Sequence, residues 1–167
     1  FRPTTAAKKA EVFFDSIGSS MSFRDFAELE NEIGRITSAA EEAKIPLRVF
    51  GGAAMRLHCP MNERLYASLG RPMSEDMDFV TYDGLGRSTR KFFTSLGYDP
   101  HVSMALSGAT ATGRHRQIFY DKFGNKAVDL CLGTLKMSHV IDFSSRLEVD
   151  FPTVPLAELA LQKLQIA

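Results

Sequence analysis

The stretch SEDMDFV, residues 74–80, is the most informative part of this chain because two acids in it alternate with apolar residues. On a strand, residues i and i+2 point to the same face, so Asp76 and Asp78 converge while Met77 and Phe79 turn toward the core. Two such carboxylates repel each other unless a cation joins them. Oxygen donors of this kind favour Mg²⁺, and we expect this ion to bind here.

A third acid lies in the later strand-like run KAVDLCL, residues 126–132. Asp129 is the one acid in this apolar context, and an isolated buried carboxylate is costly unless it is paired, hydrogen-bonded or metal-bound. If this strand pairs beside the one that contains Asp78, Asp129 reaches the same point. An Asp-x-Asp alone is more often a solvated strand end or a helix N-cap. The third acid is what favours a metal site.

Two adjacent glycines, Gly51 and Gly52, follow the strand-like run LRVF at residues 47–50. They allow the backbone to approach a phosphate closely before a helix that we expect to start at Ala53. A glycine pair alone is most often a turn. In the same chain as the acids, it predicts a phosphate-binding loop.

Together these segments resemble the polymerase-beta-type nucleotidyltransferase superfamily, and within it the branch of AbiEii-like toxins and related uncharacterised nucleotidyltransferases. The resemblance covers roughly Val49 to the chain end and depends on GGAA at 51–54, RPMSEDMD at 71–78 and VDL at 128–130. Ser74 stands where the family usually has Thr, which keeps the hydroxyl. The segment 58–70 is longer than is common in the family.

The resemblance implies an α+β (α/β-like) nucleotidyltransferase fold, with a mixed sheet of about five strands flanked by helices. It implies that Asp76, Asp78 and Asp129 are catalytic and hold two divalent ions, Mg²⁺ or Mn²⁺. Gly51 and Gly52 would hold the triphosphate of an NTP substrate. Asp129 would also assist activation of the attacking hydroxyl.

Three further residues are candidates for binding the nucleotide. Ser74 lies on the same face as Asp76 by strand parity and could donate to a phosphate. Arg71 or Lys163 could neutralise charge on the triphosphate. The alternatives are a surface charge for Arg71 and, for Lys163, a helix lysine that extends its ammonium to solvent.

The charge balance argues against a protein that binds duplex DNA by bulk charge, because the net charge is +0 and the pI is near 7.1. A local basic patch remains open, with Arg87, Arg90, Lys91, Arg114, His115 and Arg116 as its candidates. Two cysteines without CxxC spacing favour a reduced, cytoplasmic protein. No apolar run approaches the length of a membrane span, so we expect no membrane partner.

We expect an N-terminal helical segment, 1–46, packing on a nucleotidyltransferase core, 47–167, that is truncated at its C-terminal helix. The first segment should hold a helix over 5–17 and a longer one with Phe26, Leu29, Ile33, Ile36 and Ala40 on one stripe, ending before Pro46. The expected elements of the core are strand 47–50, helix 53–59, strand 77–82, helix 87–96, strands near 101–106, 115–121 and 126–132, a short strand 139–143, an extended 147–151 and a helix from Pro155.

Three functions remain open on this basis. The first is a nucleotidyltransferase that moves a nucleoside monophosphate from an NTP to a hydroxyl on RNA, protein or a small molecule. The second is a catalytically inactive relative that binds nucleotide or a partner, and the third is a metal-dependent phosphodiesterase. The three acids favour the first over the second, and the glycines favour triphosphate binding over hydrolysis. The resemblance implies a toxin-like role, with tRNA or protein as acceptor and an antitoxin protein as partner.

Overall fold

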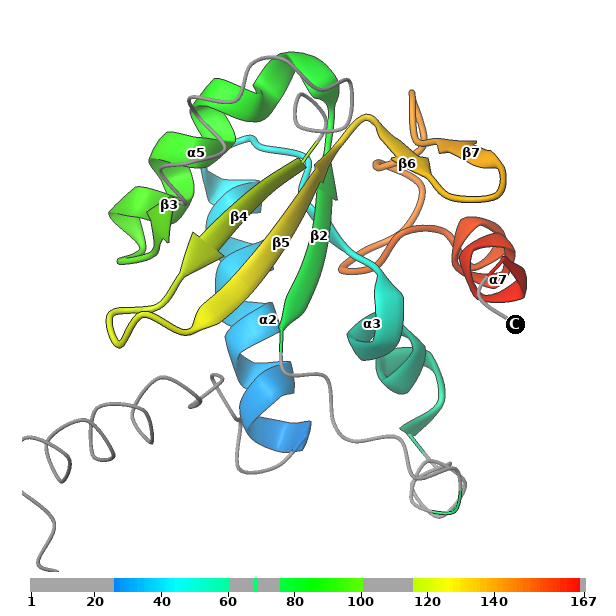
Figure 1. The fold of residues 1–167 in the computed structure, drawn as a ribbon, viewed down its shortest axis with the longest axis horizontal. Coiled ribbons are helices and arrows are strands. Elements are labelled where there is room, and N and C mark those ends of the chain that lie inside the picture. The colour runs from blue at the N-terminus through cyan, green and yellow to red at the C-terminus, as the bar shows by residue number, and fades with distance from the viewer. Residues whose placement is uncertain (1–25, 61–67, 69–75, 101–115, 166–167) are drawn as a thin grey trace, which may run out of the picture.

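The computed structural model describes residues 26–60, 68, 76–100 and 116–165 of the chain (Figure 1). Its helices are α2 (Phe26–Glu42), α3 (Gly51–His58), α5 (Gly86–Ser95) and α7 (Leu156–Leu164), with a 3₁₀ turn η2 (Asp83–Leu85). Its strands are β1 (Arg48–Val49), β2 (Met77–Thr81), β3 (Asp99–Pro100), β4 (Arg116–Tyr120), β5 (Lys126–Leu132), β6 (Thr134–Lys136) and β7 (Val140–Asp142). The expected helix over 5–17 and the strand near 101–106 lie outside the described residues.

Five strands form one mixed sheet in the order β1-β2-β5-β4-β3. Strands β2 and β5 are parallel, and the other neighbours are antiparallel. The remaining two strands, β6 and β7, pair in a small sheet of their own. The expected α+β class with a mixed sheet of about five strands is therefore confirmed.

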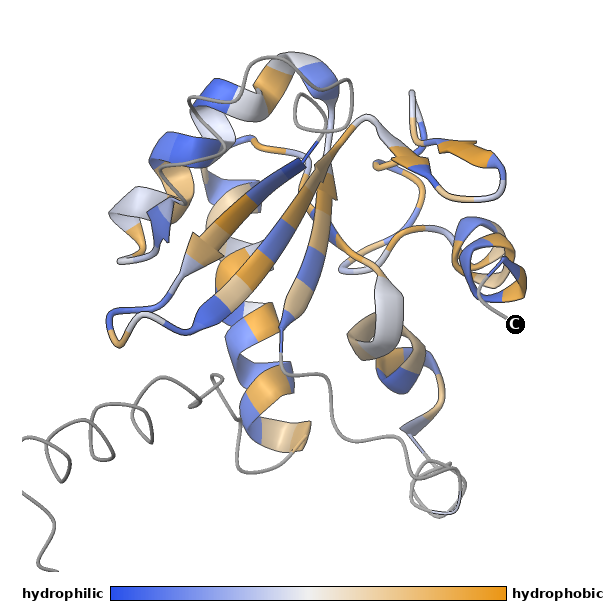
Figure 2. Cartoon of the chain, in the orientation of Figure 1, coloured by the Kyte–Doolittle hydropathy of each residue, from blue (hydrophilic) through white to orange (hydrophobic). Residues whose placement is uncertain are grey.

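Alternation along the two central strands separates a core face from a polar face. Met77, Phe79, Val128 and Leu130 are fully buried, and hydrophilic residues alternate with them along β2 and β5 in Figure 2. Because residues i and i+2 share a face, the acids at 78 and 129 lie on the opposite side of the sheet from this core. The prediction that Met77 and Phe79 turn toward the core is confirmed.

Helix α2 covers the core with the predicted apolar stripe. Leu29, Ile33, Ile36 and Ala40 are buried in the same cluster as the sheet residues, and Phe26 packs against that cluster. The helix ends at Glu42, and Lys44 then adopts a positive φ of 56°. It stops before Pro46, as predicted, because a proline disfavours helical backbone at the residue that precedes it.

Helix α5 supplies the aromatic part of the core. The ring of Phe93 lies 4.8 Å from that of Phe119 and 5.9 Å from those of Phe79 and Tyr98, measured between centroids. Phe92 packs edge-on against Phe93. Both phenylalanines therefore belong to the core and offer no exposed platform for stacking bases.

Two expectations about the later chain have different outcomes. The hairpin between β4 and β5 is present, with the Asp121 side chain accepting hydrogen bonds from the amides of Phe123 and Asn125. Residues 147–151 form turns rather than an extended strand. The Leu147 amide donates to the Tyr82 hydroxyl at 3.2 Å, so a side chain takes the place of a partner strand.

Helix α3 begins two residues earlier than expected, at Gly51, and α7 follows Pro155 as predicted. The loop before α7 is tied to the main sheet by hydrogen bonds between Val49 and the segment at Pro152 and Val154. These bonds fix α7 beside α3, a contact that shapes the site below. Within the part of the chain that the structure describes, no helix has the length and apolar character needed to cross a bilayer.

Candidate metal centre

Three carboxylates converge on the polar face of the sheet. Asp78 and Asp129 are direct register partners on the parallel strands β2 and β5, and Asp76 immediately precedes β2. One oxygen from each acid lies within 4.8 Å of one from each of the others. Asp129 is buried and the other two are half-buried. The predicted meeting of these three side chains therefore follows from parity and from strand pairing.

Gly51 makes room for one of these acids. Its φ is +72°, and a Cβ at this position would lie 2.1 Å from Oδ2 of Asp78. The preceding amide, that of Phe50, donates to the Asp78 carbonyl at 2.9 Å, which joins the start of α3 to β2. Only glycine combines this backbone conformation with such a close approach.

The amide of Gly51 already has a protein acceptor. It donates to Oε1 of the buried Gln162, on α7, at 3.1 Å. Gln162 therefore fixes the first residue of α3, a role that sequence reasoning missed because the two residues are far apart in the chain. Gly52 is the second residue of α3 and is partly exposed. Phosphate binding by the two glycines stays a prediction.

Two basic residues bind the acids, and sequence reasoning missed both as members of the site. Arg116 donates two hydrogen bonds to Asp129. Its Nε lies 2.5 Å from Oδ1, and its Nη2 donates to Oδ2. Lys126 Nζ bonds to Oδ2 of Asp76 and lies 3.0 Å from Oδ2 of Asp129. From the sequence, Arg116 is a candidate only for a local basic patch.

A register shift explains why Lys126 lies on the acid face. Residues three apart on a regular strand point to opposite faces, which would direct Lys126 away from Asp129. Here Phe119 pairs with Val128 while Tyr120 pairs with Lys126, so the pairing shifts by one residue. A bulge of this kind re-aims a side chain. Arg116 reaches the acid face without a register shift, because it lies diagonally across from Asp129 on the neighbouring strand β4. The parity of the hairpin could have predicted this position.

The pKa values of Asp78 and Asp129 shift in opposite directions. Burial, then the charges of Asp76 and Asp129, raise the pKa of Asp78 to about 7, against smaller opposing effects of Lys126 and Lys163. Burial also acts to raise the pKa of Asp129, but the hydrogen bonds from Arg116 and Lys126 outweigh it and hold this pKa below its usual value. Asp78 is thus the acid whose negative charge is least compensated.

A cavity of about 300 Å³ opens beside the acids. Asp78, Asp129, Arg116 and Gln162 line it, together with Lys136 from the β6–β7 hairpin. Oxygen donors and basic side chains therefore face one space, the combination that a metal-bound polyphosphate requires.

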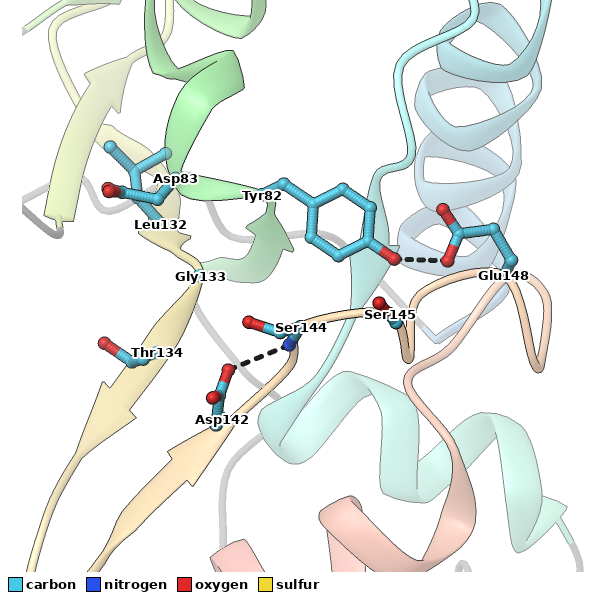
Figure 3. A pocket seen from close by; sticks show the side chains of 9 residues that line it. All are labelled: Tyr82, Asp83, Leu132, Gly133, Thr134, Asp142, Ser144, Ser145 and Glu148. Atoms are coloured by element: carbon cyan, nitrogen blue, oxygen red, sulfur yellow. Dashed lines mark hydrogen bonds between the residues drawn. The ribbon is translucent and has the colours of Figure 1, made fainter.

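A larger hollow of about 680 Å³ lies where β2 and β5 end, and it extends to the end of β7 (Figure 3). Tyr82, Asp83, Asp142 and Glu148 line it, and its described lining includes no basic side chain. The Tyr82 hydroxyl bonds to Glu148, and the Asp142 carboxylate accepts from the Ser144 amide at 2.9 Å. Sequence reasoning did not identify this hollow, because its residues come from four separate segments.

The other predicted site residues are placed only in part. Lys163 lies on α7, and its charge acts on Asp78. Arg71 and Ser74 lie outside the described residues, so their proposed contacts with a triphosphate stay predictions. The residues that could hold a metal are thus Asp76, Asp78 and Asp129.

Comparison of the chain with family models, with curated proteins and with solved structures found no match of any of the three kinds. The resemblance to nucleotidyltransferases therefore depends on the residues quoted above. The geometry of the acids and their neighbours is the basis of the function proposed below.

Proposed function

We propose that this protein is a metal-dependent nucleotidyltransferase that transfers a nucleoside monophosphate from an NTP to a hydroxyl acceptor. The observation that carries the proposal is the convergence of Asp76, Asp78 and Asp129 from two adjacent parallel strands. The mixed sheet is compatible with the nucleotidyltransferase fold, which forms part of the proposal. The acceptor, with tRNA or protein as candidates, and an antitoxin partner are proposed from the resemblance alone.

The three acids fit a hard divalent cation. All donors are carboxylate oxygens, the set that Mg²⁺ and Mn²⁺ prefer. The raised pKa of Asp78 reflects a buried negative charge with too little positive charge near it. When bound, a pair of divalent ions would lower the pKa of the acceptor hydroxyl and neutralise the leaving pyrophosphate.

The chain's own residues would divide the remaining work. The acceptor oxygen forms a bond to the α-phosphorus, the bond from that phosphorus to the pyrophosphate oxygen breaks, and the hydroxyl proton is lost. Asp129 borders the cavity and is suited to orient the hydroxyl. Arg116, Lys126 and Lys163 bring positive charge to the same place, which suits an anionic triphosphate.

One observation favours a second candidate, a non-catalytic relative that binds nucleotide or a partner. Arg116 and Lys126 already form ion pairs with Asp129. In a protein without catalytic metals, such pairs, with the one between Lys126 and Asp76, would hold two of the three acids together. The two candidates differ in whether a divalent ion can enter among the acids, and this can be measured.

The decisive experiment is calorimetric titration of the four NTPs, each with Mg²⁺, into the protein and into the Asp76→Asn/Asp78→Asn variant. We expect Mg²⁺-dependent binding of at least one NTP to the unaltered protein and its loss in the variant. An Asp83→Asn/Asp142→Asn variant is the matched control, since it removes the same charge from the larger hollow. It should bind as the unaltered protein does.

Chemistry is tested separately by pyrophosphate release and by transfer of α-phosphorus label to an RNA or protein acceptor. NTP binding with neither release nor transfer favours the non-catalytic relative. Cleavage of a phosphodiester without any NTP requirement favours the phosphodiesterase. NTP binding that survives in the Asp76→Asn/Asp78→Asn variant contradicts the proposed site.

A further inference from the structure

Lys126 occupies a position between two of the proposed metal ligands. Its Nζ bonds to Oδ2 of Asp76 and lies 3.0 Å from Oδ2 of Asp129. We propose that Lys126 is a built-in competitor of the metal, holding the acids together in the metal-free protein and leaving them when a divalent ion binds. The inference rests on the proposed function and adds to it a control on metal affinity.

The competition follows from which oxygens are already in use. Oδ1 of Asp129 accepts from Arg116, and its Oδ2 accepts from both Arg116 and Lys126. Oδ2 of Asp76 accepts from Lys126. The Asp78 carboxylate accepts no hydrogen bond from any residue that the structure describes. An incoming ion can therefore reach Asp78 directly, but it gains the other two acids only at the expense of existing bonds.

Lys126 is better suited than Arg116 to give way. Arg116 holds Asp129 through a planar two-nitrogen fork, whereas Lys126 binds through a single ammonium on a flexible stem. The Lys126 side chain is 37% exposed, so its ammonium can return to water. Its departure removes one bond from Oδ2 of Asp76 and one from Oδ2 of Asp129. Arg116 can stay in place and orient Asp129.

The charge balance links this exchange to the nucleotide. Two basic side chains form ion pairs with Asp76 and Asp129, whereas Asp78, the third carboxylate, forms none with the residues that the structure describes. If both basic residues stayed in contact with the acids, two bound divalent ions would change the net charge of the site from negative to positive. The released ammonium of Lys126 is then placed to meet a phosphate oxygen. Metal binding without nucleotide should accordingly be weak.

The test measures the affinity for Mn²⁺ by electron paramagnetic resonance. It is made without nucleotide on the unaltered protein and on the Lys126→Met and Lys126→Gln variants. We expect both variants to bind Mn²⁺ about tenfold more tightly, or more, because a competing charge at contact distance is gone. The control is Lys136→Met, which removes the same charge at a residue that lines the neighbouring cavity and makes no hydrogen bond or ion pair to the three acids. Its affinity should change less than about threefold.

A second measurement needs no variant. Lysine amines of the unaltered protein are labelled briefly with acetic anhydride, with and without Mn²⁺, and the sites are quantified by mass spectrometry. We expect Mn²⁺ to increase the labelling of Lys126 and to leave that of Lys122, in the hairpin turn, unchanged.

The outcomes separate this inference from the proposed function. Mn²⁺ binding that is equal in the unaltered protein and both Lys126 variants overturns the competition and leaves the metal site in place. An equal gain in Lys136→Met also overturns it, since a general field then explains the effect. Labelling of Lys126 that does not respond to bound Mn²⁺ does the same. Absence of Mn²⁺ binding from every form overturns both proposals.

Discussion

Two acid-lined hollows lie among the described residues, and the smaller one is the better candidate for chemistry. In the cavity of about 300 Å³, the Asp129 carboxylate lies within hydrogen-bond distance of the Arg116 side chain, and Asp78 lines the same space. The hollow of about 680 Å³ has acids and hydroxyls, but no basic side chain in its described lining (Figure 3). Volume alone would select the larger hollow, whereas the buried charges and their ion pairs favour the smaller cavity.

Asp78 in the smaller cavity and Asp142 in the larger hollow have pKa values shifted in opposite directions. In the smaller cavity, burial and neighbouring acids raise the pKa of Asp78 to about 7. In the larger hollow, hydrogen bonds from Ser144 lower the pKa of Asp142, which is exposed to solvent. A bound cation would stabilise the buried charge of Asp78, whereas the charge of Asp142 is already stabilised by its hydrogen bonds from Ser144. This contrast can be tested by changing matching residues in each region.

The two regions each contain a glycine with positive φ, and we expect very different results from replacing them. In Gly51→Ala, the new Cβ would meet Oδ2 of Asp78 at 2.1 Å. The acid must move, so Mn²⁺ binding should fall by more than about 100-fold, with a loss of about 3 kcal/mol in stability. Calorimetry and urea unfolding measure the two effects.

Gly133→Ala is the matched change in the larger hollow, where φ is +67° and the nearest atom to a Cβ is Asp83 Cβ at 3.1 Å. It should cost about 1–2 kcal/mol in stability and leave Mn²⁺ affinity unchanged. Equal losses of metal binding in both variants would contradict the assignment of the acids at 76, 78 and 129 to a separate site.

The pH dependence of stability should differ in direction between the two regions when metal is chelated. For Asp78, the pKa rises from its usual 3.8 to about 7 on folding, so the folded state binds the extra proton between these values. The stability that this acid contributes is present below pH 4 and is lost as the pH rises through 7. Asp78→Asn should therefore stabilise the metal-free protein by about 2–4 kcal/mol at pH 8.

Asp142 provides the opposite case. Its pKa is lowered on folding, so its contribution is present above its usual pKa and is lost as the pH falls through the folded value. Asp142→Asn should reduce stability slightly at pH 8 and not at low pH. Urea unfolding of both variants in EDTA between pH 3 and pH 8 checks the two signs. A lower stability of Asp78→Asn at pH 8 would mean that other groups satisfy this acid.

A bound divalent ion should stabilise the fold through the smaller cavity only. At a concentration one hundred times its dissociation constant, Mg²⁺ should add about 2.7 kcal/mol. For a chain of this size, that raises the melting temperature by about 5–10 °C. The Asp76→Asn/Asp78→Asn variant should show no such shift, and Asp83→Asn/Asp142→Asn should show all of it. Differential scanning calorimetry with Mg²⁺ or EDTA makes the measurement.

The smallest change that we expect concerns Tyr82, in the larger hollow. Tyr82→Phe removes the bond to Glu148 and the acceptor of the Leu147 amide. Its cost should be about 1 kcal/mol in urea unfolding. Mn²⁺ affinity and NTP binding should not change. A loss of NTP binding in this variant would extend the functional site into the larger hollow.

Strand parity explains why much of the fold and the meeting of the acids could be predicted. Alternation in residues 77–81 and 126–132 determines which side chains face the core, and apolar spacing defines helix α2. A diagonal hairpin pair would also have indicated Arg116. Lys126 could not be predicted from spacing, because a register shift of one residue brings it to the acid face.

Long-range contacts account for the rest of what the sequence did not indicate. Gln162 accepts a hydrogen bond from the Gly51 amide only because the loop before α7 returns to β1. Residues 147–151 alternate as a strand would, yet Tyr82 provides a hydroxyl in place of a neighbouring backbone. Both contacts depend on tertiary packing, which local propensity does not encode.

The hydrogen bond between Gly51 and Gln162 also determines when the site can first exist. The two residues are separated by 111 positions, so a ribosome that has just made the glycine must add more than a hundred residues before the glutamine is available. At about 5–20 residues per second, that interval lasts several seconds. The nascent chain therefore carries its acids for seconds before α7 can fix the start of α3, and the proposed metal site is complete only late in synthesis.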